Sequence, residues 1–134
     1  MKALFDTNVF LAAFLTEGVC AKLLTRARKR QFNLSTCPFI LHECERILAK
    51  KFSATKQEQE TALALISEAA QDIVTPSEKI SGACRDKDDD NVLTCAVEAA
   101  VEYLVTGDKD LLQLKVFRGI RIITPRDFEL LFDN

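Results

Sequence analysis

The chain has 134 residues and a formal net charge of −2, with 18 basic and 20 acidic residues. This length fits one hydrophobic core, so we expect a single domain over residues 1–134. The charge balance excludes a basic field over the whole surface, and any contact with nucleic acid must come from local patches. No run of about 18 apolar residues occurs, which predicts a cytoplasmic protein that does not span a membrane.

The cysteines do not follow the pattern of a disulfide framework or a zinc site. They are five in number and none has C-x-x-C spacing. We therefore expect reduced thiols that act as small apolar side chains in a reducing compartment. The residues concerned are Cys20, Cys37, Cys44, Cys84 and Cys95.

Short apolar runs alternate with helical patterns along the whole chain. "KALF" and "EYLVT" have the length and composition of strands, whereas "VFLAAFL" has the composition of a helix. Pro38 suits the first turn of the helix that follows "FNLSTC". In chain order we expect a strand over residues 2–5, helices over 9–15 and 18–30, a strand over 32–37, helices over 38–51 and 55–71, a strand over 72–75, a helix over 89–101, a strand over 102–106, a short helix within 107–114, a strand over 120–124 and a helix over 125–132.

This alternation predicts a three-layer α/β fold with a mostly parallel sheet. Parallel strands need crossover connections, and these place helices on both faces of the sheet. In such folds ligands bind beyond the carboxyl ends of the strands, near the point where the strand order reverses. We therefore look for functional residues at that edge.

Three acidic residues lie at positions from which their side chains could meet at the carboxyl ends of the strands. Asp6 follows the first predicted strand and Asp108 follows the fourth, although each by itself is equally well explained as a turn residue or a helix cap. Glu43 lies inside the apolar stripe of its helix, where an acid is costly unless it is paired or bound to a cation. The alternative for Glu43 is a structural ion pair, for example with Arg46.

Residues 84–100, "CRDKDDDNVLTCAVEAA", place four aspartates before an apolar helix. A helix start stabilises one or two acids by roughly 0.3–1 kcal/mol each. Four aspartates are more than this effect explains. Asp86 and Asp88 precede the predicted helix and are explained as caps or dipole partners. By helical spacing, Asp89 points along the apolar face and Asp90 lies nearer its edge.

A cluster of these acids would need a counter-charge. Two carboxylates about 4 Å apart repel each other by around 4 kcal/mol at an effective dielectric constant of 20, so protons, lysines or a metal must neutralise them. Oxygen ligands without histidine or cysteine favour a hard cation, Mg²⁺ or Mn²⁺, over zinc. The single histidine, His42, lies on a different helix face from Glu43.

Motifs over most of the chain match one known family. They are "LFDTNVFLAAFL", "STCPFILHECERILAKKF", "DKDDDNVLTCAVEAAVEYLVTGDKDLL" and "ITPRDF", in that order. In this combination the sequence resembles the PIN domain family of metal-dependent ribonucleases, especially its toxin-like prokaryotic branch. The resemblance implies a five-stranded parallel sheet in which the strands of Asp6 and Asp108 are adjacent at the centre. It also implies an endoribonuclease that hydrolyses RNA with metal-activated water.

The resemblance also implies roles for individual residues. It implies Mg²⁺ or Mn²⁺ as cofactor, and it keeps Asp90 as a further candidate ligand beside the preferred Asp89. Local basic groups are candidates for RNA contact, although a solvated helix end explains each equally well. By this resemblance the expected catalytic and metal-binding acids are Asp6, Glu43, Asp89 and Asp108, with Asn8 and Thr106 as supporting groups. From their positions beside Asp108, we also expect Asp110 as a supporting group and Lys109 as a substrate-binding cation. The other basic candidates are Arg26, Arg28, Lys29, Arg30, Lys50 and Lys51.

The resemblance extends to partners. It implies the toxin of a toxin–antitoxin pair, with RNA as substrate, a small antitoxin as partner and a homodimer as assembly. One alternative is a PIN-like module without activity that binds RNA or protein. Another is a phosphoacceptor receiver domain, which is disfavoured because the last predicted strand ends in "ITPRD" without the lysine that such a domain needs.

Overall fold

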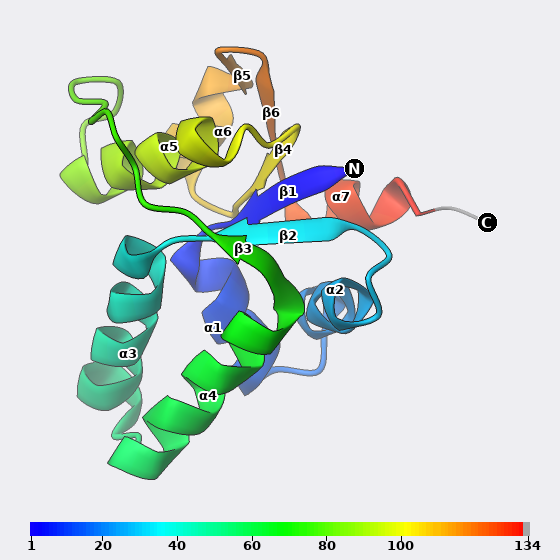
Figure 1. The fold of residues 1–134 in the computed structure, drawn as a ribbon, viewed down its shortest axis with the longest axis vertical. Helices are drawn as coiled ribbons and strands as arrows, with labels where there is room; N and C mark the ends of the chain where they lie inside the picture. Colours follow the sequence, from blue (N-terminus) through cyan, green and yellow to red (C-terminus); the bar gives the residue numbers. More distant parts are fainter. Residues whose placement is uncertain (133–134) are drawn as a thin grey trace.

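The computed structural model describes residues 1–132, in which six strands form one sheet (Figure 1). The order of strands across the sheet is β3-β2-β1-β4-β6-β5. All neighbouring strands are parallel except β5 and β6, which are antiparallel. The strands are β1 (Lys2–Phe5), β2 (Asn33–Thr36), β3 (Ala70–Ile73), β4 (Tyr103–Val105), β5 (Val116–Phe117) and β6 (Ile120–Ile123).

Helices cover both faces of the sheet, which confirms the predicted three-layer α/β fold. Figure 1 shows one group of helices below the sheet and another above it. A short helix near the C-terminus packs against the second helix of the chain. The lower four are α1 (Thr7–Leu15), α2 (Val19–Arg28), α3 (Pro38–Phe52) and α4 (Lys56–Ala69), the upper two are α5 (Lys87–Ala99) and α6 (Lys109–Leu114), and the last is α7 (Pro125–Leu130).

The sixth strand, β5, corrects the expected number of five. It pairs with β6 across a turn in which Arg118 and Gly119 have positive φ values of 50° and 83°, as in a two-residue hairpin. A run of two residues has no periodicity that a sequence pattern can reveal. Two boundaries also differ from the prediction: β3 begins at Ala70 and not at residue 72, and α5 begins at Lys87 and not at residue 89.

The central strand β1 fixes the place where a site can form. Its residues Ala3, Leu4 and Phe5 are fully buried, as expected for a parallel strand covered on both faces. The chain runs outward from β1 through β2 to β3 and then returns to the other side of β1 as β4. The strand order therefore reverses between β1 and β4, and the carboxyl ends of these two strands border the crevice.

A disulfide joins Cys37 and Cys95, so the prediction that all five cysteines are reduced is wrong for this pair. Cys37 precedes α3 and Cys95 lies in α5, and their Cα atoms are 6.2 Å apart. The two residues are 58 positions apart in the sequence, so no local spacing indicates the bond. Cys20, Cys44 and Cys84 are free thiols.

No single helix within residues 1–132 is long and apolar enough to cross a membrane. The pair α1 and α2 reaches the required length and composition together, but the chain bends by 101° between them. Both helices bury apolar side chains, such as Phe10 and Leu23, in the hydrophobic core.

Candidate metal centre

Asp6 follows β1 at the point where the strand order reverses, and it is buried. Its backbone N–H donates to the carbonyl oxygen of Val105 at 3.0 Å, and Thr106 Oγ1 donates to Asp6 Oδ2 at 2.8 Å. Burial raises the pKa of Asp6, the hydrogen bond from Thr106 lowers it, and the charge of Asp108 raises it again. The carboxylate is therefore held in one orientation at a position where its negative charge is costly.

Asp108 caps the N-terminus of α6 on the loop that follows β4. Its Oδ1 accepts hydrogen bonds from the backbone N–H groups of Asp110 at 2.8 Å and Leu111 at 3.1 Å. The N–H of Asp108 donates to Thr106 Oγ1 at 3.0 Å, so the buried hydroxyl of Thr106 links Asp108 to Asp6. The expected adjacency of the strands that bear Asp6 and Asp108 is confirmed by the parallel pairing of β1 and β4.

Glu43 reaches this edge from the second turn of α3, with a side chain that is 12% exposed. Thr7 Oγ1 donates to Glu43 Oε1 at 2.7 Å. Burial raises the pKa of Glu43, the Thr7 hydrogen bond lowers it, and the charges of Asp88 and Asp6 raise it again. The ion pair with Arg46 does form, but it is long, at 3.7 Å, and the arginine is half-exposed, so it offsets little of the charge.

Asp89, in the first turn of α5, joins Asp6, Glu43 and Asp108, and we call these four residues the acid cluster. Asp89 is 7% exposed, and its Oδ2 has no hydrogen-bond partner among the described residues. Burial and the charges of Asp108, Asp6 and Asp86 raise the pKa of Asp89 to about 7. One side-chain oxygen each from Asp89, Asp108 and Asp110 lies within 4.8 Å of the other two. A buried carboxylate oxygen without a partner, beside two further carboxylates, fits the oxygen ligand set of a hard divalent cation.

Asp90 is also buried but is not part of this group of acids. Its Oδ2 accepts from the backbone N–H of Gly82 at 2.9 Å, and its Oδ1 accepts from that of Cys84 at 2.8 Å. Both carboxylate oxygens therefore fix the loop that leads into α5. Of the two candidate aspartates in this turn, the structure brings Asp89 to the cluster.

Asp88 has a contact that the sequence does not predict. Asp86 is the N-cap of α5 and accepts from the N–H of Asp88 at 2.9 Å, as a capping residue does. The charge of Asp88 and its hydrogen bond to Glu43 raise the pKa of Glu43, so these two carboxyl groups face each other. Because α5 begins at Lys87, Asp88 already lies on a helical face. Only the packing of α5 against α3 shows that this face meets Glu43.

An open cavity of ≈ 550 Å³ borders the cluster, and two of the three predicted supporting residues, Asn8 and Asp110, line it, whereas Thr106 is fully buried. Arg85 was not singled out by the sequence pattern, but its Nη2 donates to Asp110 Oδ1 at 2.8 Å. The Arg85 side chain is 87% exposed, so it stays accessible to a ligand. The residues that line this cavity are Asn8, Arg85, Gly107, Asp108, Lys109 and Asp110.

The basic end of α2 lies away from the acids, beside the amino end of β2. Arg26 donates to both carboxylate oxygens of Glu129 at 2.7 and 2.8 Å. Arg30 donates to the carbonyl oxygens of Ala69 at 2.7 Å and Glu68 at 3.0 Å. These arginines tie α2 to α7 and α4, so the structure does not bring this basic cluster to the candidate site.

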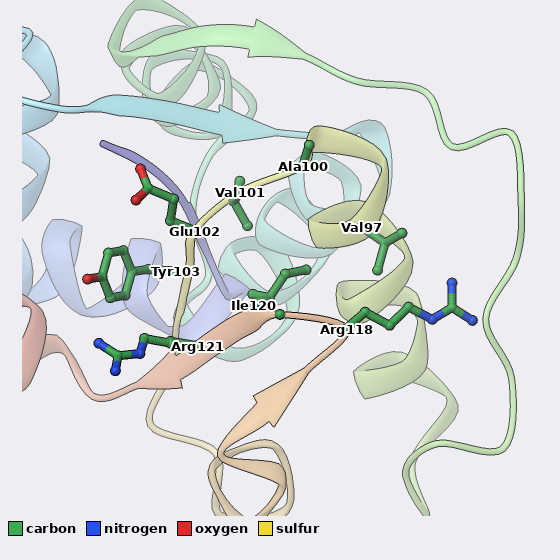
Figure 2. Close-up of a pocket in the computed structure, with 9 residues that line it drawn as sticks. Val97, Ala100, Val101, Glu102, Tyr103, Arg118, Ile120 and Arg121 are labelled. Atoms are coloured by element: carbon green, nitrogen blue, oxygen red, sulfur yellow. The ribbon is translucent and has the colours of Figure 1, made fainter.

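A larger cavity, of ≈ 580 Å³, lies at the amino edge of the sheet, opposite the acids (Figure 2). The end of α5, the start of β4 and the turn before β6 form its walls. Arg118 and Arg121 flank this cavity, but Figure 2 shows that their side chains point away from each other. Because these charges do not converge on one position, the acid cluster is the better candidate site.

The fold and the acids define the class of protein. It is an α/β domain in which four separate segments bring carboxylates to the reversal point of a mostly parallel sheet. The chain belongs to the PIN domain family, whose model matches residues 2–110. The matched region includes all four acids of the cluster.

Two comparisons extend this result. The chain is 29% identical to an uncharacterised protein of Methanocaldococcus jannaschii over an alignment of 141 residues, which covers 96% of this chain and 89% of the relative. It is also similar to the solved structure of VapBC2 from Rickettsia felis bound to a DNA fragment from their promoter, with a TM-score of 0.68 over 92% of this chain and 98% of the other. The sequence identity to that structure is 15%, so this likeness shows the fold alone.

Proposed function

We propose that the protein is a Mg²⁺- or Mn²⁺-dependent ribonuclease that hydrolyses RNA phosphodiester bonds. The observation that carries this proposal is the carboxylate of Asp89: its buried Oδ2 has no hydrogen-bond partner among residues 1–132, and one of its oxygens lies within 4.8 Å of an oxygen of Asp108 and of Asp110. A ligand set made only of oxygen supports a hard cation over zinc. Membership of the PIN domain family supports the nuclease class.

Two threonines orient the carboxylates of the proposed centre. Thr106 donates a hydrogen bond to Asp6, and Thr7 donates one to Glu43. Each acid therefore enters the site in a fixed orientation, as a preorganised centre requires. When bound, divalent cations lower the pKa of a water nucleophile and stabilise charge on the phosphate oxygens. The proposed ligands are Asp6, Glu43, Asp89 and Asp108.

Neither Cys44 nor Cys84, the free thiols near the cluster, is suited to act as a nucleophile in place of water. Burial, followed by the charges of nearby acids, raises the pKa of Cys44 to about 12 and that of Cys84 to about 11. Both thiols are therefore neutral near pH 7 and react poorly. Lys109 and Arg85, at the mouth of the cluster, supply positive charge for a substrate phosphate.

The proposal extends to a role as the toxin of a toxin–antitoxin pair in the cytoplasm. The likeness in fold to VapBC2 and the toxin-like motifs of the sequence support this role. An apolar cavity of ≈ 480 Å³ between α1, α3 and α4, lined partly by Phe14, Leu15 and Leu65, supports a protein partner. A small antitoxin is the proposed partner and a homodimer the proposed assembly. Co-purification with the product of a short neighbouring reading frame tests the pairing.

Cleavage of a mixed RNA pool tests the ribonuclease itself. We expect cleavage that requires Mg²⁺ or Mn²⁺ and that falls by at least about 100-fold in Asp6→Asn, because a lost metal ligand removes several kcal/mol of transition-state stabilisation. Asp127→Asn is the matched control, since Asp127 is an exposed acid of α7 outside the cluster. Equal rates for the wild type and Asp6→Asn, or cleavage that persists in EDTA, contradict the proposal. RNA binding without any cleavage would indicate the inactive module instead.

A further inference from the structure

A small cavity of ≈ 340 Å³ lies between α3, α5 and the segment that precedes α5. Its walls combine an aromatic ring from Phe39, an amide from Asn91 and a cation from Lys79. Phe39 is partly buried and packs against the hydrophobic core, so one side of its ring is supported by the protein. An aromatic surface beside an amide and a cation is the chemistry that binds an unpaired nucleobase.

The cavity is close to the acid cluster because its residues share helix faces with two of the acids. Phe39 precedes Glu43 by four residues on α3, and Asn91 follows Asp88 by three residues on α5, so each pair lies on one helix face. Glu43 and Asp88 face each other at the cluster. The aromatic ring is therefore about one helical turn, roughly 5 Å along the axis, from the acids.

The walls of the cavity are held in place by a covalent bond and a buried hydrogen bond. The disulfide between Cys37 and Cys95 joins the start of α3 to α5, only two residues before Phe39. The backbone N–H of Ile80 donates to Thr94 Oγ1 at 3.0 Å, which fixes the segment that carries Lys79 against α5. A cavity that is formed before its ligand arrives loses less entropy on binding.

The cavity also carries a free positive charge. The acid of this lining, Glu78, forms an ion pair with Arg118 at 3.2 Å, although both side chains are more than half-exposed. The N–H and the hydroxyl of Ser77 donate to Glu98 Oε1 at 2.8 and 2.9 Å and are already used. Lys79 is exposed and has no ion pair or hydrogen bond within residues 1–132. It is therefore available for a phosphate of a bound strand.

We infer that this cavity is a subsite for an unpaired nucleobase next to the scissile phosphate of single-stranded RNA. The inference rests on the proposed ribonuclease function. The ring of Phe39 stacks on the base, and Lys79 contacts an adjacent phosphate. The side-chain amide of Asn91 can both donate to and accept from adenine at N6 and N7, so adenine is the preferred base.

Binding of short fluorescent oligoadenylate and oligouridylate by anisotropy tests this subsite. The measurement uses the Asp6→Asn chain in Mg²⁺, so that cleavage does not interfere. We expect Phe39→Leu to lower the affinity for both oligonucleotides by about 5- to 100-fold, because stacking on the ring is lost. We expect Phe39→Tyr to retain the affinity, because its ring can still stack. We expect Asn91→Ala to remove the preference for oligoadenylate. Phe52→Leu is the matched control, because Phe52 is a half-exposed aromatic residue at the far end of the same helix.

The possible results of these binding experiments test the base subsite separately from the ribonuclease activity. Binding that is unchanged in both Phe39→Leu and Asn91→Ala, or no RNA binding at all, overturns the subsite, while metal-dependent cleavage by the wild type would still support the ribonuclease. Binding that depends on Phe39 and prefers oligoadenylate supports the subsite even if the wild type cleaves nothing. That last result would overturn the ribonuclease alone.

Discussion

Asp89 shows, at the scale of a single residue, the buried negative charge that the proposed cation would offset. Its carboxyl group is buried among other acids, and its pKa is raised to about 7. The value for an unfolded chain is about 3.9, so the folded protein binds the extra proton between these two pH values. Stability therefore falls as the pH rises from about 4 to about 7 and stays low above that range when no metal is bound.

Asp89→Asn tests this linkage because the amide cannot ionise. In EDTA we expect the variant to exceed the wild type in free energy of unfolding by on the order of 1–3 kcal/mol near pH 8, and to match it near pH 4. Urea denaturation at the two pH values measures the difference. Asp127→Asn should not raise the free energy of unfolding at either pH, because it removes a charge that the start of α7 favours. An Asp89→Asn variant that is less stable than the wild type near pH 8 would contradict the account.

The neighbouring acids Asp88, Asp89 and Asp90 differ in how well the sequence predicts their contacts. Helical spacing favours Asp89 without excluding Asp90, since Asp89 points along the apolar face and Asp90 lies nearer its edge. The partners of Asp90 are backbone N–H groups in an irregular loop, and a loop has no periodicity from which they could be predicted. The contact of Asp88 with Glu43 depends on how two helices pack, which the sequence of neither helix shows.

The disulfide between Cys37 and Cys95 acts at the scale of elements, because it joins the two helices that carry Glu43 and Asp89. A cross-link between residues 58 positions apart restricts the unfolded chain. We expect its loss in Cys37→Ser or Cys95→Ser to lower the free energy of unfolding by about 2–4 kcal/mol. Chemical denaturation with and without a reducing agent measures this effect.

A third cysteine provides the control for that experiment. Cys84 is a free thiol, so Cys84→Ser should keep the full response to the reducing agent. A wild type whose stability is the same under reducing and oxidising conditions would show that the bond contributes nothing to folding.

The elements themselves were largely predictable, for a physical reason. Each long helix buries one apolar stripe and each parallel strand is a short apolar run, so periodicity and length predict them. The strand β5 has two residues and is held only by its pairing with β6. The disulfide likewise depends on long-range packing, so neither feature leaves a local pattern in the sequence.

At the scale of the whole molecule, the net charge of −2 limits how strongly the protein can bind the proposed RNA substrate. With no general basic field, affinity must come from a few local cations, namely Arg85, Lys109 and Lys79. For single-stranded RNA each phosphate contact contributes about −0.7 to the slope of log affinity against log salt concentration, so three contacts predict a slope near −2. Anisotropy titrations of Asp6→Asn over a range of salt concentrations measure it.

Variants of single lysines make this prediction specific. Lys79→Ala should reduce the magnitude of the slope by about 0.7, because one phosphate contact is lost. Lys56→Ala, at the start of α4, should leave the slope unchanged. A slope steeper than about −4 would show that an additional basic surface, such as the end of α2, binds the RNA.

The central claim for the whole molecule is that carboxylates from four distant segments form one metal centre. Crystals soaked with Mn²⁺ test it directly, because anomalous scattering locates the ion without reference to activity. We predict Mn²⁺ bound among Asp6, Glu43, Asp89 and Asp108. Ordered Mn²⁺ bound only elsewhere, with no ion among these four residues, would contradict the account.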